Sequence, residues 1–257
     1  CVKLGVVTGR DLAQACRDSF STPVVWALWI LAELAMVACD MAEVIGSAIA
    51  LQILFGIPLV WGCLVTVADV FLILLLQHRG FRLIEALVVT LIATIGVCFI
   101  FELVYSRPPL APLARGFLPS LALFKNQEML FIAIGIIGAT VMPHNPYLHY
   151  AIIQTRKFTP DEAGRRTAVR FGTLDSTLAL GIALFINAAI LIVAAAAFHG
   201  GIHEQGADIR DAQKLLAPVL GAAAAGTLFA VALLASGQNS TLTGTLAGQI
   251  IMEGFLR

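Results

Sequence analysis

Six long stretches of apolar residues set the strongest limit on how this chain can fold. They lie at about 23–54, 58–77, 83–105, 128–155, 174–199 and 222–254. A helix that crosses a lipid bilayer needs roughly 20 mostly apolar residues, and each stretch reaches that length. The chain has 59% hydrophobic and 12% charged residues and a mean hydropathy of +0.92, which is the composition of a membrane protein. The sequence therefore predicts an all-α membrane protein with about six spanning helices.

The positive charges alternate between the connections that join these stretches. Eleven of the sixteen Lys and Arg residues fall before the first stretch, between the second and third, after the fourth, or at the end of the chain. Because short loops rich in Lys and Arg stay in the cytoplasm, residues 1–22 and 156–173 are predicted to be cytoplasmic. The formal net charge is zero, so bulk electrostatics do not indicate a nucleic-acid partner.

Three carboxylates interrupt the first apolar stretch, namely Glu33, Asp40 and Glu43. Their spacing of seven and three residues places them along one face of a helix. An ionisable group within the membrane is costly and usually functional, so this stripe is a candidate route for protons or cations. The alternative is that the carboxylates form ion pairs that hold helices together. Glu102 lies near the end of its stretch and is expected to reach the membrane interface.

The fourth apolar stretch contains the sequence Met-Pro-His-Asn at 142–145. Pro143 has no backbone N–H and clashes with the preceding turn, so the helix is predicted to break at Pro143 and Asn145. Broken backbone at membrane depth is tolerated where it lines a polar cavity, and discontinuous helices build the substrate sites of many secondary transporters. The break therefore predicts a binding site.

The side chains and carbonyls around this break suit a metal ion. Met142 contributes a thioether, His144 an imidazole and Asn145 an amide, while the carbonyl of Ala139 loses its helical donor because that donor would be Pro143. A soft sulfur beside free carbonyls favours a transition metal over Mg²⁺ or Ca²⁺. Each feature alone has an ordinary packing explanation, but their combination within a few residues favours a site.

Two of the longer connections have their own local patterns. The Pro-Asp-Glu sequence at 160–162 predicts the start of a short amphipathic connector before the fifth stretch. The connection at 106–127 contains four prolines and is predicted to be an extended outer loop.

Four segments together resemble the Nramp family of proton-coupled divalent-metal transporters. They are "ATVMPHN" (139–145), "CDMAEVIGSAIALQILFGIPLVWG" (39–62), "GRDLAQACRD" (9–18) and "SGQNSTLTGTLAGQIIMEGF" (236–255). The resemblance covers nearly the whole chain and makes its six stretches the third to eighth spanning helices of the family. It implies that 1–257 is one transmembrane domain, incomplete because the family's first helices, with their Asp-Pro-Gly-Asn motif, and its last helices are absent.

The resemblance also implies a fold and a role for particular residues. The fold is a LeuT-like bundle of two inverted repeats, with metal bound between the broken first and sixth helices. The residues carried over are Met142 as a sulfur ligand, Ala139 as a carbonyl ligand, Asp40, Glu43 and His144 in proton movement, and Glu33 as an outward acidic position on the same helix.

The function implied by the resemblance is secondary transport rather than enzymatic catalysis. Mn²⁺ or Fe²⁺ would be the transported substrate, imported with protons by alternating access, with no cofactor and with the lipid bilayer of a bacterial inner membrane as the surroundings. Two alternatives remain at this point. One is a cation-coupled amino-acid transporter of the LeuT fold, and the other is a membrane-embedded metalloprotein without transport.

Overall fold

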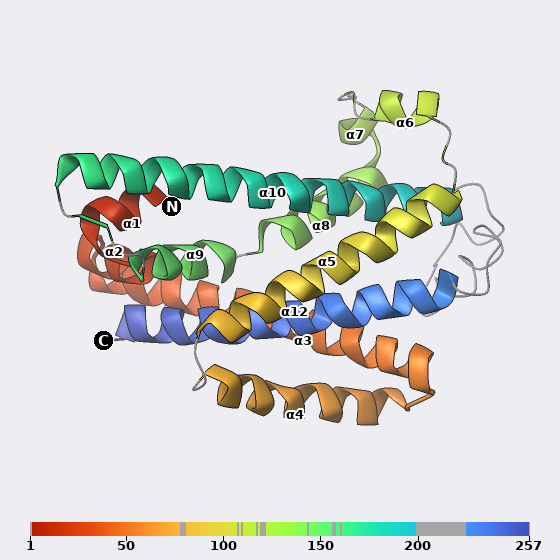
Figure 1. Cartoon of the computed structure of the whole chain (residues 1–257), viewed down its shortest axis with the longest axis horizontal. Helices are drawn as coiled ribbons and strands as arrows, with labels where there is room; N and C mark the ends of the chain where they lie inside the picture. The colour runs from red at the N-terminus through yellow and green to blue at the C-terminus, as the bar shows by residue number, and fades with distance from the viewer. Residues whose placement is uncertain are drawn as a thin grey trace. The chain divides into compact units, whose positions relative to one another are not determined.

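A computed structural model describes residues 2–77, 81–106, 108, 110–116, 118, 122–142, 144–155, 158–159, 161–198 and 225–256. These residues form helices and no strand, which confirms the all-α class. The helices, labelled in Figure 1, are α1 (Val2–Thr8), α2 (Leu12–Ser19), α3 (Thr22–Phe55), α4 (Leu59–Gln77), α5 (Phe81–Ser106), α6 (Leu110–Gly116), α7 (Ala122–Lys125), α8 (Gln127–Val141), α9 (His144–Gln154), α10 (Glu162–Phe198) and α12 (Ala225–Leu256).

Helices occupy nearly all described residues of the six predicted spanning stretches. Among the residues that the structure describes, four helical stretches are long and apolar enough to cross a membrane, namely Thr22–Phe55, Leu83–Ser106, Gln127–Gln154 and Glu162–Ala196. The apolar helix at Leu59–Asp69 is shorter. Helix α12 has 32 residues, but Ser, Thr, Asn, Gln and Gly are frequent over 236–248, which lowers its hydropathy.

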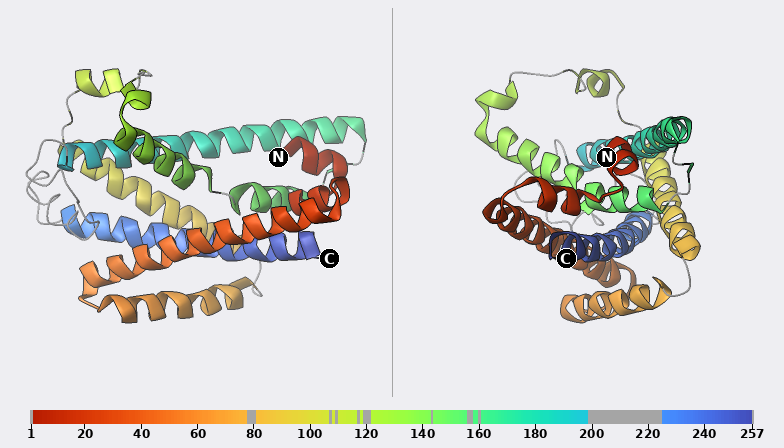
Figure 2. Two further views of the ribbon diagram at one scale, coloured as in Figure 1. Left: turned by 180° about the vertical axis from the view of Figure 1, so that it is seen from behind. Right: turned by 90° about the vertical axis from the view of Figure 1, so that its left-hand side faces the viewer.

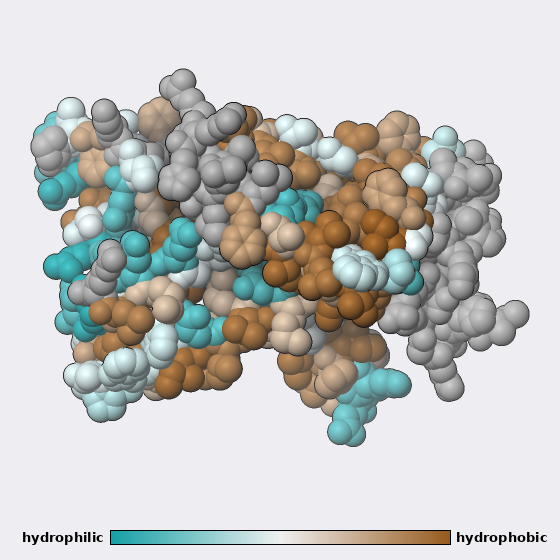
Figure 3. Space-filling view, turned by 90° about the horizontal axis from the view of Figure 1, so that it is seen from below, coloured by the Kyte–Doolittle hydropathy of each residue, from teal (hydrophilic) through white to brown (hydrophobic). Residues whose placement is uncertain are grey.

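Many large apolar side chains remain exposed on these helices. Phe131 of α8 is 79% exposed and Phe185 of α10 is 77% exposed. Figure 3 shows hydrophobic residues over the centre of one face of the molecule. Because exposed apolar area on this scale is unfavourable in water, it identifies surfaces that contact acyl chains or further helices.

The contacts divide the chain into two compact units. Unit 1 comprises residues 1–40, 119–180 and 243–257, and unit 2 comprises residues 41–118 and 181–242. Helices α3, α10 and α12 each contribute residues to both units.

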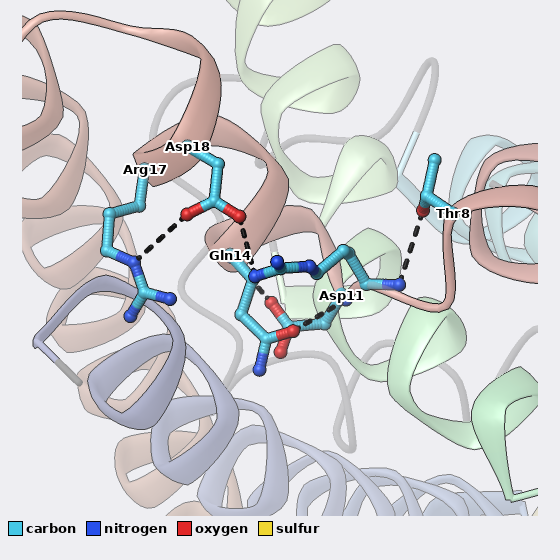
Figure 4. Close-up of polar contacts among 6 residues, drawn as sticks. Thr8, Asp11, Gln14, Arg17 and Asp18 are labelled. Carbon is cyan, nitrogen blue, oxygen red and sulfur yellow. Dashed lines mark hydrogen bonds and ion pairs between the residues drawn. The ribbon is translucent and has the colours of Figure 1, made fainter.

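Unit 1 has a core in which α2, α3, α9 and α12 meet. Its buried members are Ala13, Val25, Ala32, Met36, Leu148, Ala247, Ile251 and Phe255. A capping box begins α2: the carboxylate of Asp11 accepts from the backbone N–H of Gln14 at 2.7 Å, and the Gln14 side chain accepts from the N–H of Asp11 at 3.3 Å (Figure 4). Gly254 of α12 lies directly against Ala13, so this end of α12 supports the start of α2.

Unit 2 contains the tight turn between α3 and α4. Gly56 adopts a φ of +70° after the last residue of α3, and its N–H bonds to the carbonyl of Gln52 at 2.9 Å, which is the usual way in which a glycine ends a helix. Pro58 then precedes α4. A Cβ on Gly62 would lie 3.0 Å from the Cα of Ala48, so the absence of a side chain lets α4 approach α3 closely.

Two connections differ from their prediction. Helix α10 starts at Glu162, as the Pro-Asp-Glu signal indicates, but it continues for 37 residues, so the amphipathic connector and the spanning stretch form one helix. Asp161 accepts from the N–H of Gly164 at 3.1 Å at this start. The segment predicted to be an extended loop contains α6 and α7. Pro112 falls in the first turn of α6, where proline is tolerated.

Candidate functional site

The predicted break in the fourth apolar stretch is present between α8 and α9. Helix α8 ends at Val141 and α9 begins at His144, and the two ribbons are separate in Figures 1 and 2. Met142 joins them with φ 40° and ψ 94°, and it is the one non-glycine residue with positive φ in the described part of the chain. A left-handed conformation costs a residue with a Cβ roughly 1–2 kcal/mol. Pro143 lies outside the described residues.

Asn145 donates two hydrogen bonds to Met142, one to its carbonyl and one to its sulfur. The backbone N–H of Asn145 donates to the carbonyl of Met142 at 3.1 Å, and its side-chain Nδ2 donates to the Met142 sulfur at 3.6 Å. A methionine side chain has three rotatable bonds and is normally adaptable. Here its sulfur has a defined direction, since the amide that orients it is fixed in the first turn of α9.

The carbonyl of Ala139 has no partner within its own helix. Its acceptor position would be filled by the N–H of residue 143, and proline has none. Ala139 is exposed, and no residue of α8 is buried. One hard oxygen and one soft sulfur are therefore accessible within three residues of each other.

His144, the first residue of α9, is only 1% exposed. Its Nδ1 has no hydrogen-bond partner among the residues that the structure describes. A buried imidazole nitrogen without a partner is costly, and such an atom in a native structure calls for a specific explanation. A transferable proton or a transient water would satisfy it.

Asp40 and His144 each lie four residues along their own helix from a buried member of the core of unit 1. Met36 of α3 and Leu148 of α9 belong to the same buried cluster. Asp40 follows Met36 by four residues and His144 precedes Leu148 by four, and α3 and α9 run in opposite directions (Figure 1). Each residue is therefore about one helical turn from a buried member of the cluster along its own helix. Asp40 is exposed.

The other two carboxylates of α3 are half-buried. One carboxylate oxygen of Glu33, Oε1, is buried without a hydrogen-bond partner among the described residues. Glu43 belongs to unit 2 and is not placed relative to His144. Within the described ranges, no group of three or more His, Cys, Asp or Glu residues could hold a metal ion.

Sequence reasoning missed two polar residues. The sequence indicates no role for His149 of α9, but its Nε2 lies 3.1 Å from the hydroxyl of Ser176 on α10. Glu102 had been expected at the membrane interface, but it is 0% exposed. The local sequence gives no signal for the hydrogen bond of His149 or for the burial of Glu102, because both depend on which helix covers the residue.

These observations define an α-helical integral membrane protein with one apolar stretch broken into two helices at a polar segment. The whole chain, residues 1–257, matches the family model "Natural resistance-associated macrophage protein-like", abbreviated Nramp. The chain belongs to the Nramp family.

Relatives and solved structures agree with this membership. The chain is 60% identical over 257 residues to the "Divalent metal cation transporter MntH" of Nostoc sp., with 100% of this chain and 58% of that protein covered. It is 62% identical over 254 residues to the protein of the same name in Listeria innocua, with 99% and 57% covered. A crystal structure of the Eremococcus coleocola manganese transporter superposes with a TM-score of 0.83 at 44% identity, covering 99% of this chain and 55% of that one.

The chain thus spans little more than half the length of the relatives that it matches. The names of these relatives describe transporters rather than enzymes, in agreement with the function class predicted from the sequence. The superposition also supports the predicted LeuT-like class of fold.

Proposed function

We propose that the full-length protein is a secondary transporter that imports Mn²⁺ or Fe²⁺ together with protons by alternating access. The observation that carries this proposal is the break at Met142, which leaves a thioether and a free carbonyl accessible on a helix that is otherwise apolar. The names of the relatives, which describe divalent-metal and manganese transporters, support the same substrate class.

The metal would bind Met142 through sulfur and Ala139 through its carbonyl. The thioether sulfur selects a softer transition metal over Mg²⁺ or Ca²⁺, for which oxygen ligands alone are preferred. The remaining ligands come from elsewhere in the full-length protein, because the Asp-Pro-Gly-Asn motif that supplies them in the family does not occur in 1–257. The metal is the transported substrate, and the proposal needs no cofactor.

The proton would move through groups close to the break. His144 has a buried nitrogen without a described partner, and Asp40 on α3 follows Met36, a member of the same buried cluster as Leu148 of α9, by four residues. Glu43 continues the acidic face of α3, and Glu33 lies on the same helix. Asn145 and Pro143 would act on the shape of the break rather than on the proton. The proposed location is the bacterial inner membrane with residues 1–22 inside.

The proposal is tested by uptake of Mn²⁺ into liposomes that contain the full-length protein. Uptake should increase when the outside is acidified and should be accompanied by acidification of the lumen. Asp40→Asn should keep Mn²⁺ uptake measurable but reduce proton entry, because the amide cannot carry a proton. A matched control is Asp69→Asn on α4, which should leave both fluxes unchanged.

Three outcomes would contradict the proposal. Uptake of amino acids instead of metal would favour the cation-coupled amino-acid carrier. Metal binding without any flux would favour a metalloprotein. Unchanged proton entry in Asp40→Asn would remove Asp40 from the proton route.

A further inference from the structure

Glu102 is a buried carboxyl that the proposed transport route does not use. It lies on the last turns of α5, in unit 2, and is 0% exposed. Neither of its carboxyl oxygens has a hydrogen-bond partner among the described residues. Native proteins rarely leave buried polar atoms unpaired, so this side chain requires a specific explanation.

The surroundings of Glu102 are apolar. The face of α5 that carries it belongs to a cluster in which α5 packs against α10 and α12, and the cluster consists of Ile95, Cys98, Phe99, Ala189, Ala232 and Ala235, with Leu91, Leu103, Ile186, Leu228 and Val231 packed against them. Glu102 follows Phe99 by three residues and Cys98 by four, so it continues the same face by one turn.

No charged partner is available on the helices that pack there. Residues 176–198 of α10 and 225–252 of α12 contain no Asp, Glu, His, Lys or Arg. On α5 itself, the titratable groups within about one turn are the thiol of Cys98, which is 4% exposed, and the phenol of Tyr105, which is 52% exposed. Helix α4, which also contacts α5, has no charged residue before Asp69. Arg115 of α6, the next described cation along the chain, is exposed, whereas Glu102 is not.

An ionised carboxylate in such a place would be strongly unfavourable. Burying an unpaired charge costs several kcal/mol or more even after the protein relaxes, whereas a neutral polar group costs roughly 1–3 kcal/mol. A bound metal ion does not explain the buried carboxyl either, because no group of three His, Cys, Asp or Glu residues that could hold one occurs in the described residues. The ligand that fits one carboxyl in an apolar cluster is a proton.

We propose that Glu102 is a proton-binding site, separate from the carboxylates of α3 and from His144. The distribution of positive charge predicts that this end of α5 faces the outside of the membrane. A proton held there would exchange with the outer solution when water reaches the helical turn of α5 that carries Glu102. The inference concerns only the carboxyl and its packing, so it stands whichever ion the protein transports.

The test is infrared difference spectroscopy of the full-length protein in lipid bilayers, taken while the pH is raised from neutral to alkaline. The carbonyl stretch of a protonated carboxylic acid is distinct from the bands of a carboxylate. The wild-type protein should show a protonated-acid band at neutral pH that disappears on alkalinisation, and Glu102→Gln should lack that band. The matched control is Glu85→Gln on the same helix, whose side chain is exposed, and it should keep the band.

Thermal unfolding of the same samples provides a second readout. Glu102→Gln replaces one neutral polar group by another, so its unfolding temperature should equal that of the wild type. If Glu102→Gln does not fold, Glu102→Asp serves instead, and its protonated-acid band should move in frequency rather than vanish. A wild-type spectrum without a band that depends on residue 102 would overturn the proposal, because it would mean that Glu102 is ionised and paired.

Discussion

The side-chain amide of Asn145 donates a hydrogen bond to the thioether sulfur of Met142, with 3.6 Å between nitrogen and sulfur. The two residues flank the interruption between α8 and α9, and a backbone hydrogen bond of 3.1 Å joins them as well. A sulfur has two lone pairs. One is directed by Asn145, and the other remains available to an ion at the break.

Replacing Asn145 by Leu should therefore weaken Mn²⁺ binding without removing any ligand. Leucine keeps the side-chain size but cannot donate to sulfur, so the methionine must be ordered by the metal itself. A hydrogen bond is worth about 1 kcal/mol, which corresponds to roughly a fivefold loss of affinity. Titration calorimetry of the full-length protein measures this loss. Equal or tighter binding by the variant would show that the amide does not orient the sulfur.

The backbone conformation of Met142 leads to a prediction about stability. Met142→Ala and Met142→Gly both remove the sulfur, but only glycine tolerates a φ of 40° without a steric penalty. The glycine variant should therefore be more stable than the alanine variant by roughly 1 kcal/mol. Thermal unfolding in detergent would show this order, and the reverse order would mean that Met142 leaves the left-handed region.

The contact between α12 and α2 can be tested by comparing two glycine-to-alanine substitutions in α12, one at the contact and one away from it. A Cβ on Gly254 would meet Ala13 directly and would lie 2.9 Å from Oδ1 of Asp11, which caps α2. Gly254→Ala should destabilise the protein by roughly 1–3 kcal/mol. Gly248→Ala, also in α12, meets nothing within 4 Å and should be neutral or stabilising by up to ~1 kcal/mol. Thermal unfolding temperatures of the two variants should move in different directions, and a shared shift would exclude this contact as the cause.

The hydrogen bond between α9 and α10 can be tested with neighbouring hydroxyls. Ser176 gives its single proton to the carbonyl of Gly172 at 2.8 Å, so it accepts the N–H of His149 at 3.1 Å. Ser176→Ala should lower the free energy of unfolding by about 1 kcal/mol. Thr177→Ala is the control, because Thr177 donates to Thr173 of its own helix. Equal effects of the two substitutions would mean that the bond between the helices contributes nothing.

Much of the fold could be predicted because it depends on local chemistry. Six apolar stretches have the length of spanning helices, and Pro143 predicts the interruption that α8 and α9 display. The Pro-Asp-Glu signal correctly indicates where α10 begins. The sequence could not show that α10 continues from this polar start into the apolar stretch. Residues of both kinds favour a helix there, so no strong signal marks a boundary between them.

The environment of the candidate residues was harder to predict, since burial depends on neighbours far away in the sequence. Glu102 is covered where α5 packs against α10 and α12, although its position near the end of an apolar stretch suggested exposure. Asp40 is exposed, which its position inside an apolar stretch does not indicate. The roles of Asp40, Glu43 and Glu33 in proton movement stay predictions.

The most direct test of the account is the binding of Mn²⁺ and Ca²⁺ to the full-length protein, measured by titration calorimetry with Met142→Ala and Met129→Ala. Met142 follows the last residue of α8, whereas Met129 lies in the first turn of α8, is 45% exposed and is distant from the break. If Met142 is a ligand, its replacement should lower the preference for Mn²⁺ over Ca²⁺ by at least about tenfold, which is ~1.4 kcal/mol, whereas Met129→Ala should keep the wild-type preference. An unchanged preference in Met142→Ala would contradict the account and place the metal elsewhere.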